Sequence, residues 1–176
     1  GSAGVPQGVR HVLARRLARL SATASTVLHA AAALTAGFDF ALLQTITGLP
    51  EEVLLGCLDE AAGTGLIQVG RRPGGTWDFV HPIVRHTLYD DLNPDRRARL
   101  HRRLAEALEQ AHAAGAVDAA AEIAVQYHAS AALPGADRGL EHALRAAAEA
   151  TAGTAHERAV TLLRIAAELA RSRDAA

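Results

Sequence analysis

The residues of this chain that could do chemistry do not form a common catalytic or metal site. His81 and His86 are two of nine histidines, but they stand five residues apart, roughly 140° around a helix, and no Cys, Asp or Glu partner stands at a ligand interval. The patterns HExxH, CxxC and GxSxG do not occur. All 18 Lys+Arg positions are arginine, which excludes a Walker A lysine, a Schiff base and a lysine general base. We therefore expect this chain to be neither an enzyme nor a metal protein.

The stretch Trp77–Gln110 holds the most informative polar residues. A short aromatic strand leads to His81 and, one helical turn later, to Arg85. A lone histidine at a strand-to-helix junction is often a helix cap or a satisfied core residue. On the same purely structural interpretation, Arg85 forms an ion pair with a nearby carboxylate such as Asp90 or Asp91.

Composition limits the class of protein. The single cysteine, Cys57, excludes an intramolecular disulfide, fits a reducing compartment and lies at helical spacing among Val53, Leu54 and Leu58, so an inert core thiol is favoured over a reactive one. No apolar run approaches the roughly 20 residues needed to cross a bilayer, so we expect a cytoplasmic location and no membrane partner. Methionine is absent and Gly1-Ser2 resembles a tag remnant, which favours an excised segment of a longer protein.

The elements that position these residues predict a mostly α protein. We expect an N-terminal amphipathic helix and linker over 1–20, a winged-helix domain over 21–92 with a small two-stranded β-hairpin around the Pro-Gly-Gly turn, and a helical repeat-like domain over 93–176. The third helix of the chain, which is the second of the winged-helix domain, would begin near Phe38. The expected core of the winged helix is aromatic and aliphatic: Phe38, Phe40, Leu54, Leu58, Ile67, Trp77 and Phe79.

The second half predicts antiparallel helical hairpins that are tetratricopeptide-like, although the Trp-Gly-Tyr consensus of that repeat is not matched. Helices are expected over about 94–113, 118–132, 137–152 and 154–171, with Gly153 as the last tight turn and Thr154 with Glu157 as a capping box. In the last pair, one set of small and aliphatic residues should face another: Leu140, Ala143, Leu144, Ala147 and Ala148 against Ala159, Leu162, Leu163, Ala166 and Leu169.

Charge argues against DNA binding. The helix after Pro50 carries four carboxylates and no arginine, and these would repel the phosphates that a recognition helix must approach. The dense basic cluster lies elsewhere, in Arg96, Arg97, Arg99, Arg102 and Arg103. Carboxylates stand three or four residues from several of these arginines, which favours a solvated and partly ion-paired face over a phosphate site.

A motif F-x-H-P-I-V-R over Phe79–Arg85, followed by R-R-A-R-L-H-R-R-L-A-E-A-L and alanine-rich helices, resembles a segment of the STAND-class signalling ATPases. It is most similar to the large ATP-binding transcription regulators of the LuxR type, and the resemblance spans roughly residues 7–171. In that family a P-loop ATPase module precedes this segment, and a longer repeat array and often a DNA-binding helix-turn-helix follow it.

The resemblance implies a role for His81. In this class a histidine at the edge of the winged helix approaches the β-phosphate of ADP bound to the ATPase module and holds the inactive state. Val80, His81 and Pro82 match the Met-His-Asp triplet of the plant and animal immune receptors of the STAND class. Since proline replaces the acid here, only the histidine's role carries over. A ring N–H can donate to a phosphate oxygen, and Arg85 could reinforce the same anion.

These features lead to one hypothesis and one alternative. The first is a non-catalytic regulatory segment of a STAND-type ATPase transcription regulator. It would couple the nucleotide state to a helical arm that binds an inducer, a protein partner or the protein's own ATPase and output domains. No cofactor is expected in the segment itself, whereas ATP or ADP is expected in the parent protein. The alternative is a winged-helix DNA-binding module with a helical dimerisation tail.

Overall fold

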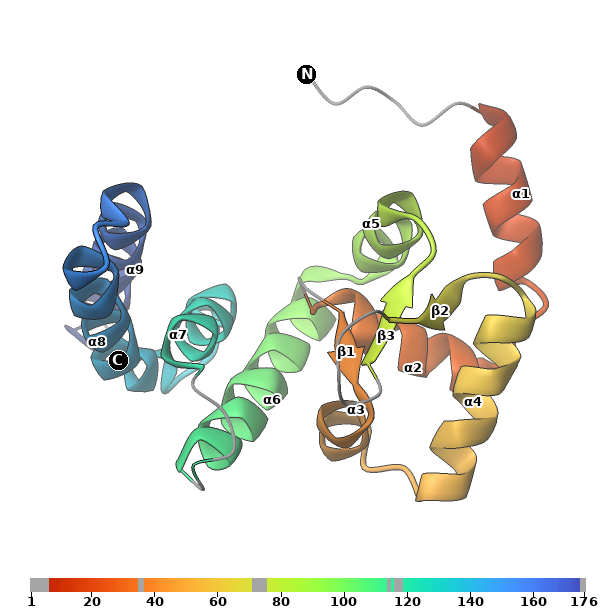
Figure 1. The fold of residues 1–176 in the computed structure, drawn as a ribbon, viewed down its shortest axis with the longest axis horizontal. Coiled ribbons are helices and arrows are strands. Elements are labelled where there is room, and N and C mark those ends of the chain that lie inside the picture. Colours follow the sequence, from red (N-terminus) through yellow and green to blue (C-terminus); the bar gives the residue numbers. More distant parts are fainter. Residues whose placement is uncertain (1–6, 35–36, 71–75, 114, 116–118, 175–176) are drawn as a thin grey trace. The chain divides into compact units, whose positions relative to one another are not determined.

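The computed structural model describes residues 7–34, 37–70, 76–113, 115 and 119–174 of the 176-residue chain. Over these residues the chain is mostly helical and contains a small three-stranded antiparallel sheet (Figure 1). It divides into two compact units, Gly1–Asn93 and Pro94–Ala176, each described separately below. In the described ranges, no helix combines the length and the apolar character that crossing a bilayer requires.

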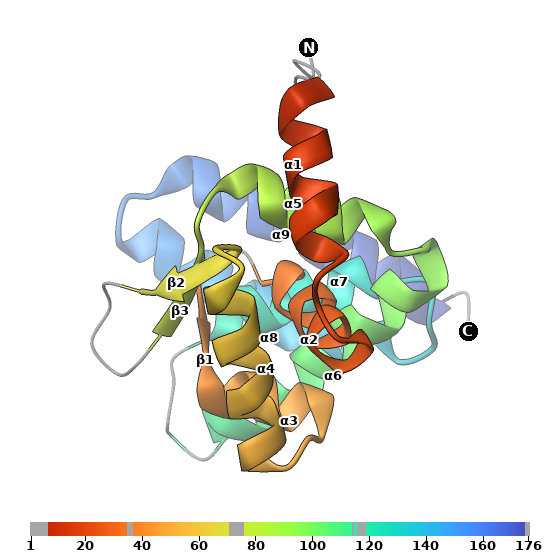
Figure 2. The ribbon, with the colours of Figure 1, turned by 90° about the vertical axis from the view of Figure 1, so that its right-hand side faces the viewer.

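The first unit begins with two helices. Helix α1 (Gln7–Leu17) lies within the helix and linker predicted over 1–20, and it extends away from α2 (Ala22–Ala32) in Figure 2. Ser21 caps α2, because its hydroxyl oxygen accepts from the Ala24 N–H at 3.1 Å. The same hydroxyl donates to the Glu60 carboxylate at 2.8 Å, so one side chain both starts α2 and ties it to α4 (Glu51–Gly63).

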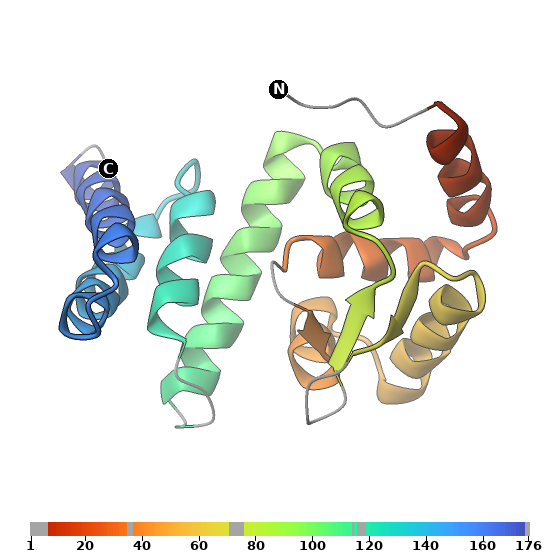
Figure 3. The same cartoon turned by 45° about the horizontal axis from the view of Figure 1, so that its top comes forward.

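The sheet of the first unit has one strand more than the sequence predicted. Strand β3 (Thr76–Phe79) lies between β1 (Phe38–Asp39) and β2 (Ile67–Val69), and both neighbours run antiparallel to it (Figure 3). The predicted hairpin is confirmed as β2 and β3, and the sequence missed only β1, whose residues were assigned to the start of a helix. Phe38 instead pairs with Trp77 across the sheet, and the Asp39 carboxylate accepts from Leu42 N–H at 2.6 Å to start α3 (Phe40–Thr47).

The core of the first unit is aliphatic. Helix α2 packs against α3, α4 and α5 (Pro82–Asp91), and the largest fully buried side chains include Leu28, Phe38, Leu43, Leu54, Leu58, Ile67, Leu66 and Leu88. The predicted core was therefore correct for Phe38, Leu54, Leu58 and Ile67. It was wrong for Phe40 of α3 and for Trp77 and Phe79 of β3, which are only partly buried. For the two strand residues the reason is that four-residue β3 and its short neighbours form too small a sheet to be covered on both faces. The predicted turn at 71–75 lies outside the described residues.

The second unit is a succession of helices, each packed on the next. They are α6 (Pro94–Ala113), α7 (Ala120–Ala129), the short 3-10 turn η1 (Ala136–Arg138), α8 (Gly139–Ala152) and α9 (His156–Asp174). Helix α7 contacts α6, α8 and α9, and α8 packs along α9. The interior between α7, α8 and α9 is built largely from alanine: Ala120, Ala146, Ala147, Ala150 and Ala159, with Leu162.

The turn between α8 and α9 differs from the predicted one. Thr154, not Gly153, adopts the left-handed conformation, with φ 59° against −83° for Gly153. Ala155 N–H donates to the Ala150 carbonyl at 2.8 Å and Thr154 N–H to that of Thr151 at 3.1 Å, the paired hydrogen bonds of a Schellman ending. The predicted capping box of Thr154 and Glu157 was wrong, because Thr154 terminates α8 and lies outside the first turn of α9.

The predicted contact faces of α8 and α9 were partly correct. Ala143, Ala147, Ala159, Leu162, Ala166 and Leu169 are buried, whereas Leu144, Ala148 and Leu163 are exposed. Gly139 shows how close the packing is, because a Cβ added there would lie 2.5 Å from the Tyr127 Cβ. The second unit therefore derives its tight packing from the smallest side chains, and it leaves some of its leucines at the surface.

Candidate functional site

His81 is the N-cap of α5. Its backbone is extended, and its ring Nδ1 accepts a hydrogen bond from the Ile83 N–H at 3.1 Å. A ring nitrogen that accepts carries no proton, so in the neutral ring the proton is on Nε2, at the opposite edge. The side chain is exposed. The cap that the sequence suggested is thus present, and it leaves an N–H of the same ring available to a ligand.

Arg85 ties α5 to the C-terminal end of α2. Its Nη1 donates to the Ala32 carbonyl at 3.0 Å and to the Leu34 carbonyl at 3.5 Å, where the helix dipole favours a positive charge. The expected carboxylate partners, Asp90 and Asp91, are thus replaced by backbone carbonyls. An anion beside His81 would have to use the other nitrogens of this guanidinium.

The arginines of α6 do not form one basic surface. Arg102 turns inward, where its guanidinium donates to Ser130 Oγ at 3.2 Å and to the carbonyls of Leu133 and Pro134 at 3.3 and 2.6 Å. Arg96, Arg99 and Arg103 are exposed. Arg102 therefore closes the segment after α7 instead of contributing to a phosphate site.

A second polar centre, which sequence reasoning missed, surrounds Glu109 on α6. The hydroxyl of buried Tyr127 donates to Glu109 at 2.8 Å, Arg138 forms an ion pair with it, and His142 Nε2 lies 3.4 Å away. Burial and the hydrogen bond to Glu109 both raise the pKa of Tyr127. Arg102 and Arg138 also lie within 5.5 Å of the Tyr127 ring centre. Helical spacing within one segment could not reveal these partners, because they come from three different elements.

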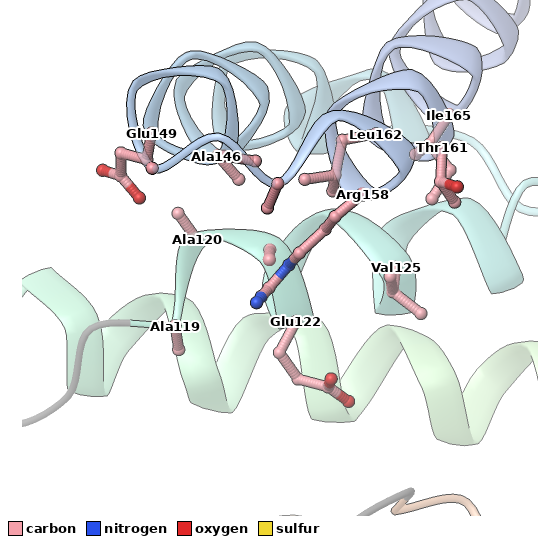
Figure 4. Close-up of a pocket in the computed structure, with 14 residues that line it drawn as sticks. Ala119, Ala120, Glu122, Val125, Ala146, Glu149, Arg158, Thr161, Leu162 and Ile165 are labelled. Carbon is pink, nitrogen blue, oxygen red and sulfur yellow. The ribbon is translucent and has the colours of Figure 1, made fainter.

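A groove of about 640 Å³ lies between α7 and the α8–α9 pair (Figure 4). Its walls are mostly small and apolar: Ala119, Ala120, Ala121, Val125, Ala146, Ala150, Gly153, Ala155, Leu162 and Ile165. Four side chains add polarity, namely Glu122, Glu149, Arg158 and Thr161. The sequence singled out none of these four as site residues.

The two carboxylates of the groove already have partners in the protein. Glu122 accepts from Gln126 Nε2 at 2.6 Å, and Glu149 accepts from Arg145 Nε at 3.0 Å. Gln126 Oε1 is 2.5 Å from the Nδ1 of buried His101, so the ring donates there and the polar chain continues into the interior between α6 and α7. Burial lowers the pKa of His101, which keeps the ring neutral.

The remaining candidates for chemistry are Cys57 and the residue types that can bind a metal ion. Cys57 is buried, and its burial together with the charge of Glu60 raises the pKa of the thiol, as expected for an inert core residue. Over the same described ranges, no group of three His, Cys, Asp or Glu is arranged to hold a metal ion.

Comparisons of the chain with protein-family models, with curated proteins and with solved structures found no match.

Proposed function

We propose that this chain is a non-catalytic regulatory segment of a STAND-type ATPase transcription regulator, with His81 as a sensor of bound ADP. The observation that carries the proposal is the capping geometry of His81. His81 Nδ1 accepts the hydrogen bond from the first turn of α5, which fixes the orientation of the exposed ring. The opposite ring nitrogen, Nε2, takes no part in this capping hydrogen bond. A positioned N–H of this kind suits a phosphate oxygen presented by another domain.

The order of elements in the first unit supports the winged-helix part of the proposal. Helix α2, strand β1, helices α3 and α4, and strands β2 and β3 follow one another in the order that the proposal expects. The exposed residues of α4 include Glu51, Glu52 and Asp59 together with Val53 and Leu55. An acidic and partly apolar face favours contact with protein over contact with DNA phosphates.

The second unit serves, in this proposal, as the tetratricopeptide-like arm that receives an inducer, a protein partner or the neighbouring domains. Its consecutive helix packing supports that role, since stacked helical pairs present extended surfaces to partners. The parent protein would be cytoplasmic and would bind ATP or ADP through its own P-loop module.

The test uses the protein encoded by the complete reading frame, in which we expect GxxxxGK[ST] upstream and a helix-turn-helix downstream. His81→Ser keeps a side chain that caps helices well and removes the imidazole. Loss of one hydrogen bond to a charged phosphate should weaken ADP retention roughly 10- to 100-fold and raise basal activity. His86→Ala is the matched control, because His86 is an exposed histidine on the same helix.

Three outcomes would count against the proposal. Unchanged ADP retention in His81→Ser would remove His81 from the mechanism. A reading frame without a P-loop would remove the ATPase. Tight binding of duplex DNA by the present chain at physiological salt, measured by mobility shift, would favour the DNA-binding alternative.

A further inference from the structure

The groove between α7, α8 and α9 has the size and lining of a small-molecule site. Its volume of about 640 Å³ falls within the roughly 300–1,000 Å³ typical of such sites. The alanines on its walls leave this space unfilled, and Leu162 and Ile165 form an apolar floor. An apolar body placed here would remove hydrocarbon surface from water on both partners.

Arg158 gives the groove one cationic group that the described residues leave uncommitted. Its side chain extends from α9 across the groove toward α7 (Figure 4), and it has no hydrogen bond or ion pair with any described residue. Of the two acidic residues of the lining, Glu149 is paired with the Arg145 guanidinium, whereas Glu122 accepts from the neutral Gln126 amide and keeps its charge. The Arg158 guanidinium is therefore the positive charge that a ligand would meet.

The first turn of α7 adds a weaker attraction for an anion. The N-cap, Ala119, lines the groove and makes no side-chain capping hydrogen bond. The backbone N–H groups of a first turn favour negative charge.

We propose that this groove binds a small amphiphilic monocarboxylate, with the carboxylate on Arg158 and the hydrocarbon body along the alanine walls. The site goes beyond the function proposed above and does not depend on His81 or on an ATPase module.

The lining also selects against other ligands. A single arginine would balance only half of the charge of a dianionic phosphate, and Glu122 would repel a dianion more strongly than a monoanion. A sugar would need several hydrogen-bonding side chains, yet the Thr161 hydroxyl already donates to the Glu157 carbonyl at 2.9 Å. Charge complementarity and an apolar wall thus point to one carboxylate on a hydrocarbon chain.

The test is a titration of the whole chain with octanoate, in which calorimetry and the NMR chemical shifts of groove residues measure binding. We expect saturable binding that 1-octanol and inorganic phosphate do not reproduce. Arg158→Gln should weaken octanoate binding about 10-fold or more, the loss typical of a hydrogen bond to a charged group. Arg164→Gln, an exposed arginine of α9 outside the groove, should change binding less than about 2-fold.

A variant that fills the groove tests the binding site independently of Arg158. Ala121 is a partly buried wall residue, and Ala121→Leu should reduce octanoate binding while circular dichroism stays unchanged. Equal binding of octanol and octanoate, equal affinity in Arg158→Gln, competition by phosphate or the absence of saturable shifts in the groove would each overturn the proposal. None of these results bears on ADP retention by His81.

Discussion

The two units of this molecule are stabilised by different kinds of side chain. In the first, Leu28, Leu54, Leu58 and Leu88 fill an aliphatic interior. In the second, alanines fill much of the space between helices, and a partly buried polar centre around Glu109 connects α6, α7 and α8.

This difference changes what determines the arrangement of the helices. A buried leucine removes far more apolar surface from water than an alanine does, so a few leucines can stabilise the first unit. Alanines allow two helices to approach closely, but their side chains are too small to interlock. One alanine face can therefore slide along another at a small cost in free energy. Directional hydrogen bonds, such as the one from Tyr127 to Glu109, then specify which turns of α6 and α7 lie together.

The largest expected effect comes from truncating a leucine of the first unit. Leu58 is fully buried in α4, and Leu58→Ala should lower the free energy of unfolding by about 2–5 kcal/mol, through lost burial and the cavity left behind. Chemical denaturation followed by the fluorescence of Trp77 measures it. Leu55→Ala, at an exposed position of the same helix, is the control. Equal losses in the two variants would break the description of this core.

A matched pair of glycine substitutions compares the tightness of packing in the two units directly. Gly139→Ala would place a Cβ 2.5 Å from the Tyr127 Cβ and 3.1 Å from Leu169 Cδ1, so we expect a loss of about 1–3 kcal/mol. Gly56→Ala in α4 meets nothing within 4 Å and should stabilise its helix by about 0.5–1 kcal/mol. Thermal unfolding of both variants gives the two signs. The same sign in both would contradict the contrast in packing.

Acid should weaken the second unit through His101. Burial lowers the pKa of this ring below its ordinary 6.5, although Gln126 and Glu122 oppose the shift and Arg97 adds to it. As the pH falls, the unfolded chain takes up the proton first, so the stabilisation is complete above about pH 6.5 and is lost below it. The difference in unfolding free energy between the wild type and His101→Gln should therefore shrink as the pH falls from 7.5 to 5. A pH-independent difference would exclude His101 as the cause.

The smallest effect concerns the turn between α8 and α9. Thr154 adopts a left-handed backbone that a β-branched residue disfavours, so Thr154→Gly should stabilise the protein by about 1 kcal/mol. The neighbouring Gly153→Glu control leaves that left-handed position unchanged. Thermal unfolding that shows destabilisation by Thr154→Gly would argue against this conformation.

Local signals in the sequence were sufficient for most helices. Pro50, Ser21 and the Asn93-Pro94 pair stand where helices begin, because capping and the fixed φ of proline act within a few residues. The burial of Cys57 followed in the same way from Leu54 and Leu58, which share its helical face, whereas Val53 is exposed.

Other features depended on partners far away in the chain. Strand β1 is only two residues long, and it forms because Phe38 pairs with Trp77. Short apolar segments of this kind carry no helical or strand periodicity of their own. The partial burial of Trp77 and Phe79 likewise followed from the size of the sheet and could not be predicted from residue type.

By itself, the sequence determined the mostly helical composition, the order of the helices and the position of His81 at the start of α5, since propensity and capping are local. Tertiary structure alone decided that Arg85 binds the carbonyl end of α2 and that Glu109 contacts Tyr127, Arg138 and His142. It also decided that alanines of α7 and α8 line a groove that Arg158 of α9 crosses. These outcomes depend on which buried polar groups and which unfilled volumes meet when distant helices pack, and no periodicity within one segment encodes that meeting.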